Sequence, residues 1–414
     1  MMSKLEFALA GAAVLGLTAC QTAIPVAQER SAADIHSNAI VLDAHADIML
    51  AETSPLYLGA DGGSKVAPEK LITGEFDAVV MAIAAGPQLR TAEGDAQARA
   101  ESLAKLDAVQ TLMASNPDTF ALATTADQVR ANSELGLISV ILGFQNAQSL
   151  EGDVDRIDAF YAEGVRLFGL THLGHNDFAD SSRPRFDGET GTYEATEEHG
   201  GLSPLGVAAV ERIDALGGLV DVSQMSKAAT LQAIEIATLP VIASHSNAKV
   251  LSDVTRNLSD EEIDRIGETG GVIHIAAFSA YLVDLSDADL KGSIRDVRLA
   301  AGLPETYSYP YELYWELKSD EEKITFLTNM RALVGGETVS RMVDHIDYVV
   351  QRIGVDHVGI GTDFNHGGGI VGFEEADGAS AVTEELVARG YSDEDINKIW
   401  GGNFLRVLDA AANR

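Results

Sequence analysis

Short apolar runs alternate along the chain with longer stretches in which apolar residues recur at helical spacing. The runs lack the alternation of a strand with one face in water, so we expect strands buried on both faces. The predicted strands cover residues 39–43, 78–84, 138–144, 165–170, 218–222, 240–243, 271–276 and 357–361. The predicted helices between them include residues 95–114, 154–162, 203–216, 228–237 and 261–266.

About eight such units predict an α/β fold, the (β/α)8 TIM barrel, with a doubly wound open sheet as the alternative. No low-complexity segment or long linker divides residues 34–414, so we expect a single domain there. Residues 279–337 form too long a connection for a simple loop, which predicts an excursion over one end of the barrel.

Polar side chains recur where the predicted strands end. In chain order they are His45, Asp47, Gln145, His172, Gln224, His245 and Asp363. The active sites of TIM barrels lie at the C-terminal ends of the strands. This shared position favours an enzyme over scattered structural histidines.

The first predicted strand leads into Asp43-Ala44-His45-Ala46-Asp47. Because side chains alternate along a strand, Asp43, His45 and Asp47 would share one face. An imidazole among carboxylates suits a divalent metal. The alternative is a hydrogen-bonded His–Asp pair that caps the strand.

Further candidates follow later strands. His245 is predicted as a metal ligand or general base, and Asp363 as a ligand that accepts a proton from water, with a turn or N-cap role as the alternative for Asp363. Arg256 would clamp a substrate carboxylate or form a surface ion pair. His366, three residues after Asp363, is an additional candidate ligand. The histidines without a partner pattern, predicted as structural, are His36, His199, His274, His345 and His357.

The chain is strongly acidic, with 29 Lys and Arg residues against 63 Asp and Glu residues and a formal net charge of −34. Nucleic-acid binding needs a basic surface, so this composition argues against such a partner. It also argues against attraction to anionic lipid by charge.

Residues 1–20 predict a lipoprotein signal peptide, because Lys4 precedes an apolar stretch that is too short to span a bilayer. Cys20 ends a Leu-Thr-Ala-Cys sequence that resembles a bacterial lipobox, in which the cysteine is lipidated. An ordinary signal peptide is the alternative. Gln21 follows, and its resemblance to Gram-negative sorting rules predicts the periplasmic face of the outer membrane. Residues 21–33 would form a tether.

Motifs from about residue 40 to residue 414 resemble the membrane dipeptidase (renal dipeptidase) family of the amidohydrolase superfamily. They are Asp43-Ala44-His45-Ala46-Asp47, Gly164-Val165-Arg166 leading to Leu170-Thr171-His172, Val220-Asp221-Val222-Ser223, residues 240–246, Arg256-Asn257, Gly361-Thr362-Asp363-Phe364 and Gly402-Asn403-Phe404-Leu405-Arg406. The resemblance implies a metal-dependent (β/α)8 barrel that cleaves dipeptides, including some with a D-residue at the C-terminal side. It also implies a homodimer.

The resemblance assigns roles to individual residues. It implies that His45 and Asp47 bind a first zinc, and that Asp363 completes this site and handles protons. His245 would bind a second zinc.

The resemblance further implies that His172 polarises the scissile carbonyl and that Arg256 holds the C-terminal carboxylate.

Two positions depart from the family. Gln145 stands where the family has a metal-bridging glutamate, and Gln224 where it has the other histidine of the second zinc. Because zinc prefers nitrogen, sulfur or carboxylate donors, one retained zinc is expected, with two as the alternative.

The leading hypothesis is therefore a metal-dependent dipeptidase with an altered, mononuclear zinc site. One alternative is a hydrolase of another amide or lactam that bears a carboxylate. The other is a non-catalytic binding protein derived from the same fold.

Overall fold

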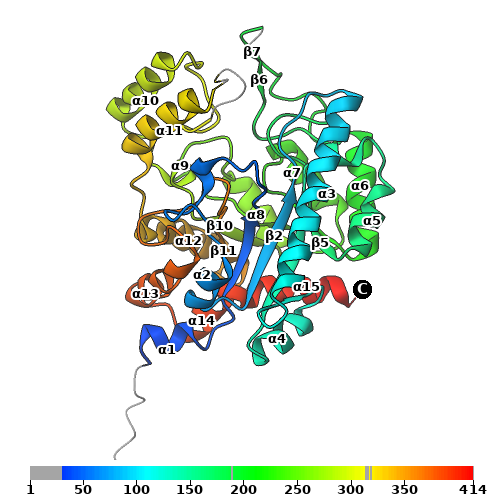
Figure 1. Ribbon diagram of the computed structural model, residues 1–414, viewed down its shortest axis with the longest axis vertical. Coiled ribbons are helices and arrows are strands. Elements are labelled where there is room, and N and C mark those ends of the chain that lie inside the picture. The colour runs from blue at the N-terminus through cyan, green and yellow to red at the C-terminus, as the bar shows by residue number, and fades with distance from the viewer. Residues whose placement is uncertain (1–29, 188–189, 313–316, 318, 414) are drawn as a thin grey trace, which may run out of the picture.

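Eight parallel strands form a nearly closed barrel in the computed structural model, which describes residues 30–187, 190–312, 317 and 319–413 (Figure 1). The strands pair in the order β1, β2, β4, β5, β8, β9, β10 and β11. They are β1 (Leu42–Asp47), β2 (Ala78–Ala84), β4 (Ile138–Gln145), β5 (Val165–Gly169), β8 (Leu219–Asp221), β9 (Ile242–Ala243), β10 (Val272–Ala276) and β11 (Val358–Gly361). The TIM-barrel prediction is confirmed.

Closure of the barrel depends on the segment that follows β11. The Asp363 N–H donates to the carbonyl oxygen of His45 at 2.9 Å, and the Asp47 N–H donates to that of Phe364 at 2.9 Å. The Asp43 carboxylate accepts from the backbone N–H of Thr362 at 2.8 Å and from its hydroxyl at 2.5 Å. Burial raises the pKa of Asp43 to about 7. Asp43 thus joins the first strand to the last.

Seven of the strands begin and end within two residues of the predicted bounds. The bounds of the first strand were predicted wrongly. It was expected at residues 39–43, whereas β1 runs from Leu42 to Asp47. The last residues of β1 include polar side chains that are buried. A prediction based on apolar residues therefore placed the end of the strand too early. A register shift between Asp43 and Ala46 also interrupts the pairing of β1 with β2.

Helices surround the barrel. Local capping signals fix several boundaries: the Ser203 side chain accepts from the N–H of Gly206 at the start of α6, and Gly217 ends this helix in the left-handed conformation. The helices are α1 (Ala32–His36), α2 (Pro68–Thr73), α3 (Ala92–Ser115), α4 (Ala126–Glu134), α5 (Arg156–Ala162), α6 (Pro204–Leu216), α7 (Lys227–Ile236), α8 (Asp260–Glu268), α9 (Ser279–Leu282), α10 (Ala288–Ala300), α11 (Asp320–Val334), α12 (Val339–Ile353), α13 (Ser380–Ala388), α14 (Asp393–Asn397) and α15 (Asn403–Ala412).

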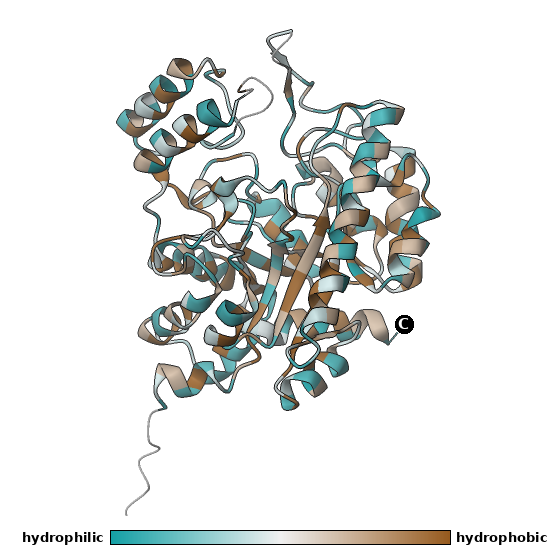
Figure 2. Cartoon of the chain, in the orientation of Figure 1, coloured by the Kyte–Doolittle hydropathy of each residue, from teal (hydrophilic) through white to brown (hydrophobic). Residues whose placement is uncertain are grey.

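The barrel is filled at the N-terminal ends of its strands. Leu42, Leu219 and Ile242, the first residues of their strands, pack in one buried cluster with Phe404 and Leu408 of α15. Figure 1 shows α15, in red, beneath the strands, and Figure 2 shows the apolar colour of β2 between the helices. The opposite end of the barrel is therefore the end that can hold a site.

In the described part of the chain, three short strands lie outside the barrel and were not predicted. β3 (Phe120–Leu122) adds to β4, and β6 (Phe186–Asp187) pairs with β7 (Thr192–Tyr193). The connection at residues 279–337 contains α9, α10 and α11, and Figure 1 shows the latter two as a pair set apart from the barrel.

The predicted signal peptide, Cys20 and most of the tether lie outside the described residues, and α1 begins at Ala32, within the tether. Among the helices of the described residues, none combines the length and the apolar character needed to cross a membrane.

Candidate metal centre

The polar residues at the strand ends are held by unusual backbone geometry. Asn146, Gln224, Asp363 and Asn365 all have φ between 57° and 83°. This left-handed region is uncommon for residues other than glycine and concentrates at functional sites. Here it occurs where strands β4 and β11 end and just after β8, at the end of the barrel away from α15.

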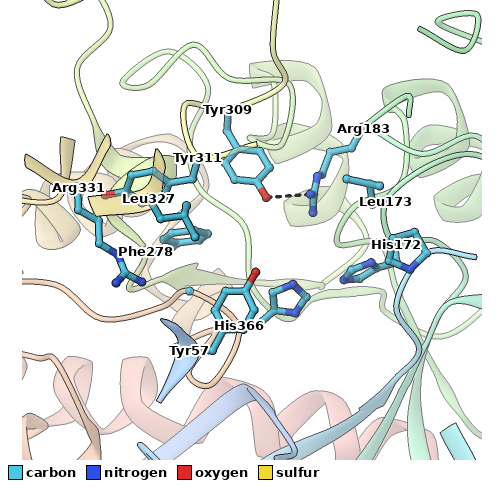
Figure 3. A pocket seen from close by; sticks show the side chains of 12 residues that line it. Tyr57, His172, Leu173, Arg183, Phe278, Tyr309, Tyr311, Leu327, Arg331 and His366 are labelled. Carbon is cyan, nitrogen blue, oxygen red and sulfur yellow. Dashed lines mark hydrogen bonds between the residues drawn. The ribbon is translucent and has the colours of Figure 1, made fainter. Parts of the chain in front are cut away.

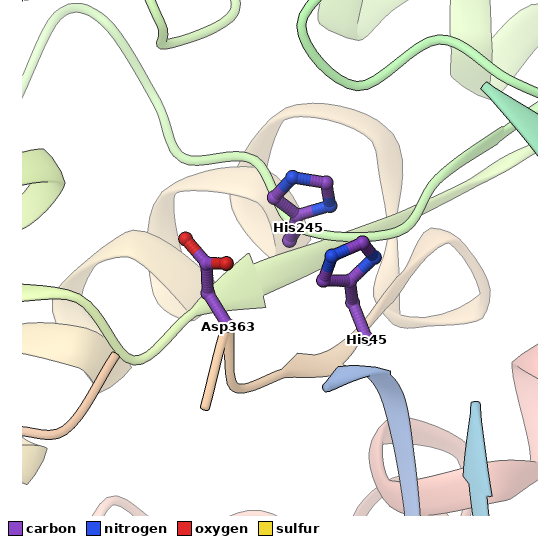
Figure 4. A group of neighbouring side chains, drawn as sticks. All are labelled: His45, His245 and Asp363. Carbon is purple, nitrogen blue, oxygen red and sulfur yellow. The ribbon is translucent and has the colours of Figure 1, made fainter. Parts of the chain in front are cut away.

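His45, His245 and Asp363 converge from β1 and from the turns after β9 and β11 (Figure 4). One ligand atom of each lies within 4.8 Å of those of the other two. The imidazoles stack with ring centroids 3.8 Å apart, and all three residues are buried. Two imidazoles and a carboxylate form a ligand set of catalytic zinc sites.

Hydrogen bonds fix the orientation of His245. The Ser244 hydroxyl donates to Asp221 Oδ2 at 2.5 Å, so its oxygen is left to accept from His245 Nδ1 at 2.7 Å. His245 Nε2 is then unprotonated and accepts from the Gln224 Nε2 amide at 3.3 Å, with the lone pair that a metal ion would otherwise take. Such carboxylate-linked support is typical of metal-binding histidines.

Asp47 belongs to a second group, with Asp363 and His366. His366 Nδ1 donates to Asp47 Oδ2 at 2.8 Å, and Lys105 Nζ on α3 lies 3.3 Å from Asp47 Oδ1. Although burial alone would raise the pKa of Asp47, Lys105 and His366 lower it below its ordinary value. Both oxygens of Asp47 are therefore engaged by groups of the protein itself.

The residues fit one metal ion better than two. Nε2 of His45 is buried without a hydrogen-bond partner among the described residues, as expected of an atom that binds a metal. Gln145, at the end of β4, has neither amide atom paired there. Gln145 and Gln224 add no charge to the set. His45, His245 and Asp363 are thus a group that could hold one metal ion.

His172 is buried, and both of its ring nitrogens lack a partner among the described residues. Burial holds the pKa of His172 well below its usual range, so the ring is neutral. Its centroid lies 5.1 Å from that of His366. A neutral imidazole with unused nitrogens beside the metal group can bind a substrate carbonyl.

Arg256 packs behind His245. It donates to the carbonyl oxygen of His245 at 2.6 Å and to the Ser246 hydroxyl at 3.2 Å, and its guanidinium lies over Tyr281. Its Nε is buried without a partner among the described residues. The structure therefore places Arg256 beside the metal group, and its role in substrate binding stays a prediction.

A cavity of about 190 Å³ opens beside His172 and His366 (Figure 3). A second cavity, of about 580 Å³, shares Tyr57, His172 and His366 with the first and also reaches Asp47 and Lys105. Substrate-sized space therefore adjoins the metal group.

The predicted site residues all lie at this end of the barrel. We expected His45, Asp47 and Asp363 to form one set with His245 in another; two overlapping groups could hold a metal ion, His45 with His245 and Asp363, and Asp47 with Asp363 and His366, so the ligand set stays a prediction. Sequence reasoning also missed Lys105, which no local motif marks.

The histidines predicted as structural make hydrogen bonds that tie segments together. His36 bonds to Thr383, His199 to the Asn176 carbonyl, His274 to the Ala243 carbonyl, His345 to the Ala248 N–H and His357 to the Gly271 carbonyl.

A barrel with a histidine–carboxylate site at the C-terminal ends of its strands is the architecture of a metal-dependent hydrolase. The model of the membrane dipeptidase family (peptidase family M19) matches residues 29–414, and the chain belongs to this family.

Similar proteins agree with this assignment. The chain is 28% identical over 311 residues to dipeptidase aclJ of Aspergillus oryzae, a match that covers 74% of this chain and 60% of that protein. It is 24% identical to dipeptidase 3 of Macaca fascicularis, over 75% of this chain and 52% of that protein. The chain thus spans only part of the length of these relatives.

Two solved structures are also similar. The probable dipeptidase PvdM of Pseudomonas aeruginosa superposes with a TM-score of 0.79 at 31% identity, covering 92% of this chain and 98% of that one. A metallopeptidase of Rhodobacter sphaeroides, solved with a phosphinate mimic of L-Ala-D-Ala, has a TM-score of 0.67 at 21% identity, covering 90% and 100%. At this level of identity, the similarity to the Rhodobacter sphaeroides enzyme shows only that the two chains share a fold.

Proposed function

We propose that this chain hydrolyses the amide bond of dipeptides or dipeptide-like substrates with a free C-terminal carboxylate, using one divalent metal ion, Zn²⁺. Family and fold support a metal-dependent, dipeptidase-like hydrolase. The observation that carries the single metal is the convergence of His45, His245 and Asp363 while Asp47 is engaged by Lys105 and His366.

Zn²⁺, when bound at these three residues, would supply the Lewis acidity that activates water and polarises the scissile carbonyl. Asp363 supplies the carboxylate of this group, which can take a proton from water. Asp363 accepts the proton of the attacking water and passes it to the leaving amine.

The remaining residues orient the substrate. His172 donates a hydrogen bond to the carbonyl oxygen as negative charge develops there, which stabilises the transition state. Arg256 holds the C-terminal carboxylate through its guanidinium. Arg256 also donates to the backbone carbonyl of His245. The same side chain would therefore bind the substrate and hold a metal ligand in place.

The test is turnover of a panel of dipeptides, with L- and D-residues at the C-terminal side, by the chain from residue 21 onward. Hydrolysis that a chelator abolishes and zinc restores is the expected result. Asp363→Asn should abolish turnover, whereas Asp377→Asn, a matched change at an exposed aspartate, should not. No turnover by folded, zinc-containing protein would contradict the proposal.

Such a failure would favour a second candidate, a non-catalytic binding protein. The observation behind it is that Gln145 and Gln224 occupy two ligand positions of the family. The same failure would also direct the search to lactams and other amides that bear a carboxylate.

We further propose export and lipid anchoring at Cys20, with the barrel at the periplasmic face of the outer membrane of a Gram-negative bacterium. The lipobox-like Leu-Thr-Ala-Cys sequence supports this proposal. Incorporation of labelled fatty acid that Cys20→Ala abolishes is the expected result, and unchanged labelling would contradict it. A homodimer remains a prediction that sedimentation would test.

A further inference from the structure

The cavity beside His172 and His366 has aromatic walls and two arginines (Figure 3). Its volume of about 190 Å³ is below the roughly 300–1,000 Å³ of pockets that take drug-sized ligands. It therefore suits one side chain. The apolar part of its lining is Tyr57, Pro87, Leu173, Phe278, Tyr309, Tyr311 and Leu327.

The described residues that line this cavity carry a charge opposite to that of the whole chain. No Asp or Glu occurs among the described residues that line it, although acidic residues outnumber basic ones by 63 to 29 in the sequence. Arg331 of α11 is exposed and donates to the Leu56 carbonyl oxygen at 2.8 Å. In the described part of the chain, Arg331 forms no ion pair with a carboxylate.

Arg183 supplies the second positive charge. It is buried, its Nη2 donates to the Tyr309 hydroxyl at 2.8 Å, and its guanidinium carbon lies 4.6 Å from the centre of that ring. Its Nη1 also donates to Gln224 Oε1 at 3.5 Å. In Figure 3, Arg183 and Arg331 approach the cavity from different sides.

The cavity is distinct from the predicted carboxylate site. Arg256 packs behind His245 and does not line it. A dipeptide whose C-terminal carboxylate binds Arg256 and whose carbonyl binds His172 would place its other residue beside the two cavities that His172 lines, and the arginines belong to this one.

We propose, resting on the function proposed above, that the preferred substrate carries a second carboxylate, on the residue that precedes the scissile amide. Arg331 and Arg183 bind that carboxylate, and the aromatic walls contact the carbon chain that bears it. A guanidinium binds a carboxylate with two parallel hydrogen bonds and retains its charge at all relevant pH values. Arg331 is then a residue that determines specificity.

The test compares acidic peptides with their amide counterparts, which have nearly the same shape. Turnover is measured for L-Glu-L-Ala against L-Gln-L-Ala, and for the same pairs with D-Ala. We expect kcat/KM to favour the glutamyl peptides by about tenfold or more, the effect of one charge-assisted contact worth about 1.4 kcal/mol. Arg331→Gln should reduce this ratio to near one.

Arg295→Gln is the matched control, because Arg295 belongs to α10 of the same excursion, is exposed and pairs with Asp296 and Glu305 outside the cavity. This variant should keep the wild-type ratio. Equal kcat/KM for the Glu and Gln peptides would overturn the proposal. A preference seen instead between L-Ala-L-Glu and L-Ala-L-Gln would overturn the placement of the second carboxylate.

Failure of the proposed function has a different signature. If no dipeptide is hydrolysed, that function is contradicted, and titration calorimetry with the same peptides decides the inference. Tighter binding of the glutamyl peptides that Arg331→Gln removes and Arg295→Gln retains supports the carboxylate site. Equal binding of glutamyl and glutaminyl peptides overturns it.

Discussion

Lys105 and His366 change what Asp47 can do. The resemblance to the family implies that Asp47 binds a metal, yet each of its oxygens contacts a donor of the protein, at 3.3 Å from Lys105 Nζ and 2.8 Å from His366 Nδ1. Removing one partner of a buried ion pair is costly because it leaves the other charge uncompensated. In this chain both oxygens of Asp47 therefore already have partners in the protein, and its role as a metal ligand stays a prediction.

If His45, His245 and Asp363 bind a single zinc ion, variants of His245 and Asp363 should lose that ion, whereas a variant of Asp47 should keep it. His245→Gln and Asp363→Asn should lose most of the bound zinc after dialysis, because each removes one of three ligands. Asp47→Asn should retain about one zinc per chain, as measured by elemental analysis of protein whose fold is checked by circular dichroism. Equal zinc loss in all three variants would show that Asp47 is a ligand.

His172 is expected to act on the substrate and not on the metal. His172→Ala should lower kcat by about 10²–10³-fold, the usual effect of removing a donor to a developing oxyanion. Zinc content should stay unchanged. His357→Ala, at a histidine bonded to the Gly271 carbonyl away from the site, serves as the control. Loss of zinc in His172→Ala would contradict this role.

At the scale of elements, the ends of β8 and β9 act together. Asp221 closes β8, and its carboxylate accepts from the backbone and hydroxyl of Ser244, which in turn holds His245. The family motifs include Asp221 and His245, but they do not show that Ser244 links the two by hydrogen bonds. That link depends on the pairing of β8 with β9, which the local sequence could not predict.

Ser244→Ala should therefore weaken zinc binding by about 10–100-fold, the usual effect of removing such an orienting group. Competition with a chromophoric chelator measures the affinity. Ser139→Ala, at a buried serine near the start of β4, is the matched control and should keep the wild-type affinity. An affinity for zinc that Ser244→Ala leaves unchanged would show that the hydrogen bonds from Asp221 through Ser244 do not orient His245.

The barrel strands were predictable because each is apolar and buried on both faces. β1 was the exception, since His45 and Asp47 belong to the strand itself. β3 was missed because three residues give no periodicity. The residues that change the site were missed for a different reason. Lys105 and Arg331 come from α3 and α11, far along the chain from Asp47 and Leu56, which they contact, and only the packing of those helices brings them near.

At the scale of the whole molecule, buried neutral histidines make stability depend on pH. Burial lowers the pKa of His274 to about 4, from an ordinary value of 6.5. The folded state therefore binds a proton less readily than the unfolded chain. The contribution of His274 is fully present above pH 6.5 and is lost as the pH falls from about 6.5 to about 4.

A shift of this size corresponds to about 3 kcal/mol of unfolding free energy lost across that range. Urea unfolding at several pH values should show a shallower decline for His274→Asn than for the wild type. The difference in slope isolates His274 from other titrating groups, among them His345, whose pKa burial also lowers, to about 3. Parallel slopes would contradict a neutral, buried His274.

We propose that the barrel hydrolyses dipeptides with one metal ion. The most direct test is turnover of a dipeptide while Zn²⁺ is added stepwise to protein prepared without metal. We expect activity to rise linearly and to stop rising at one equivalent per chain. A break at two equivalents would contradict the single-metal set, and activity independent of added metal would contradict the proposed function.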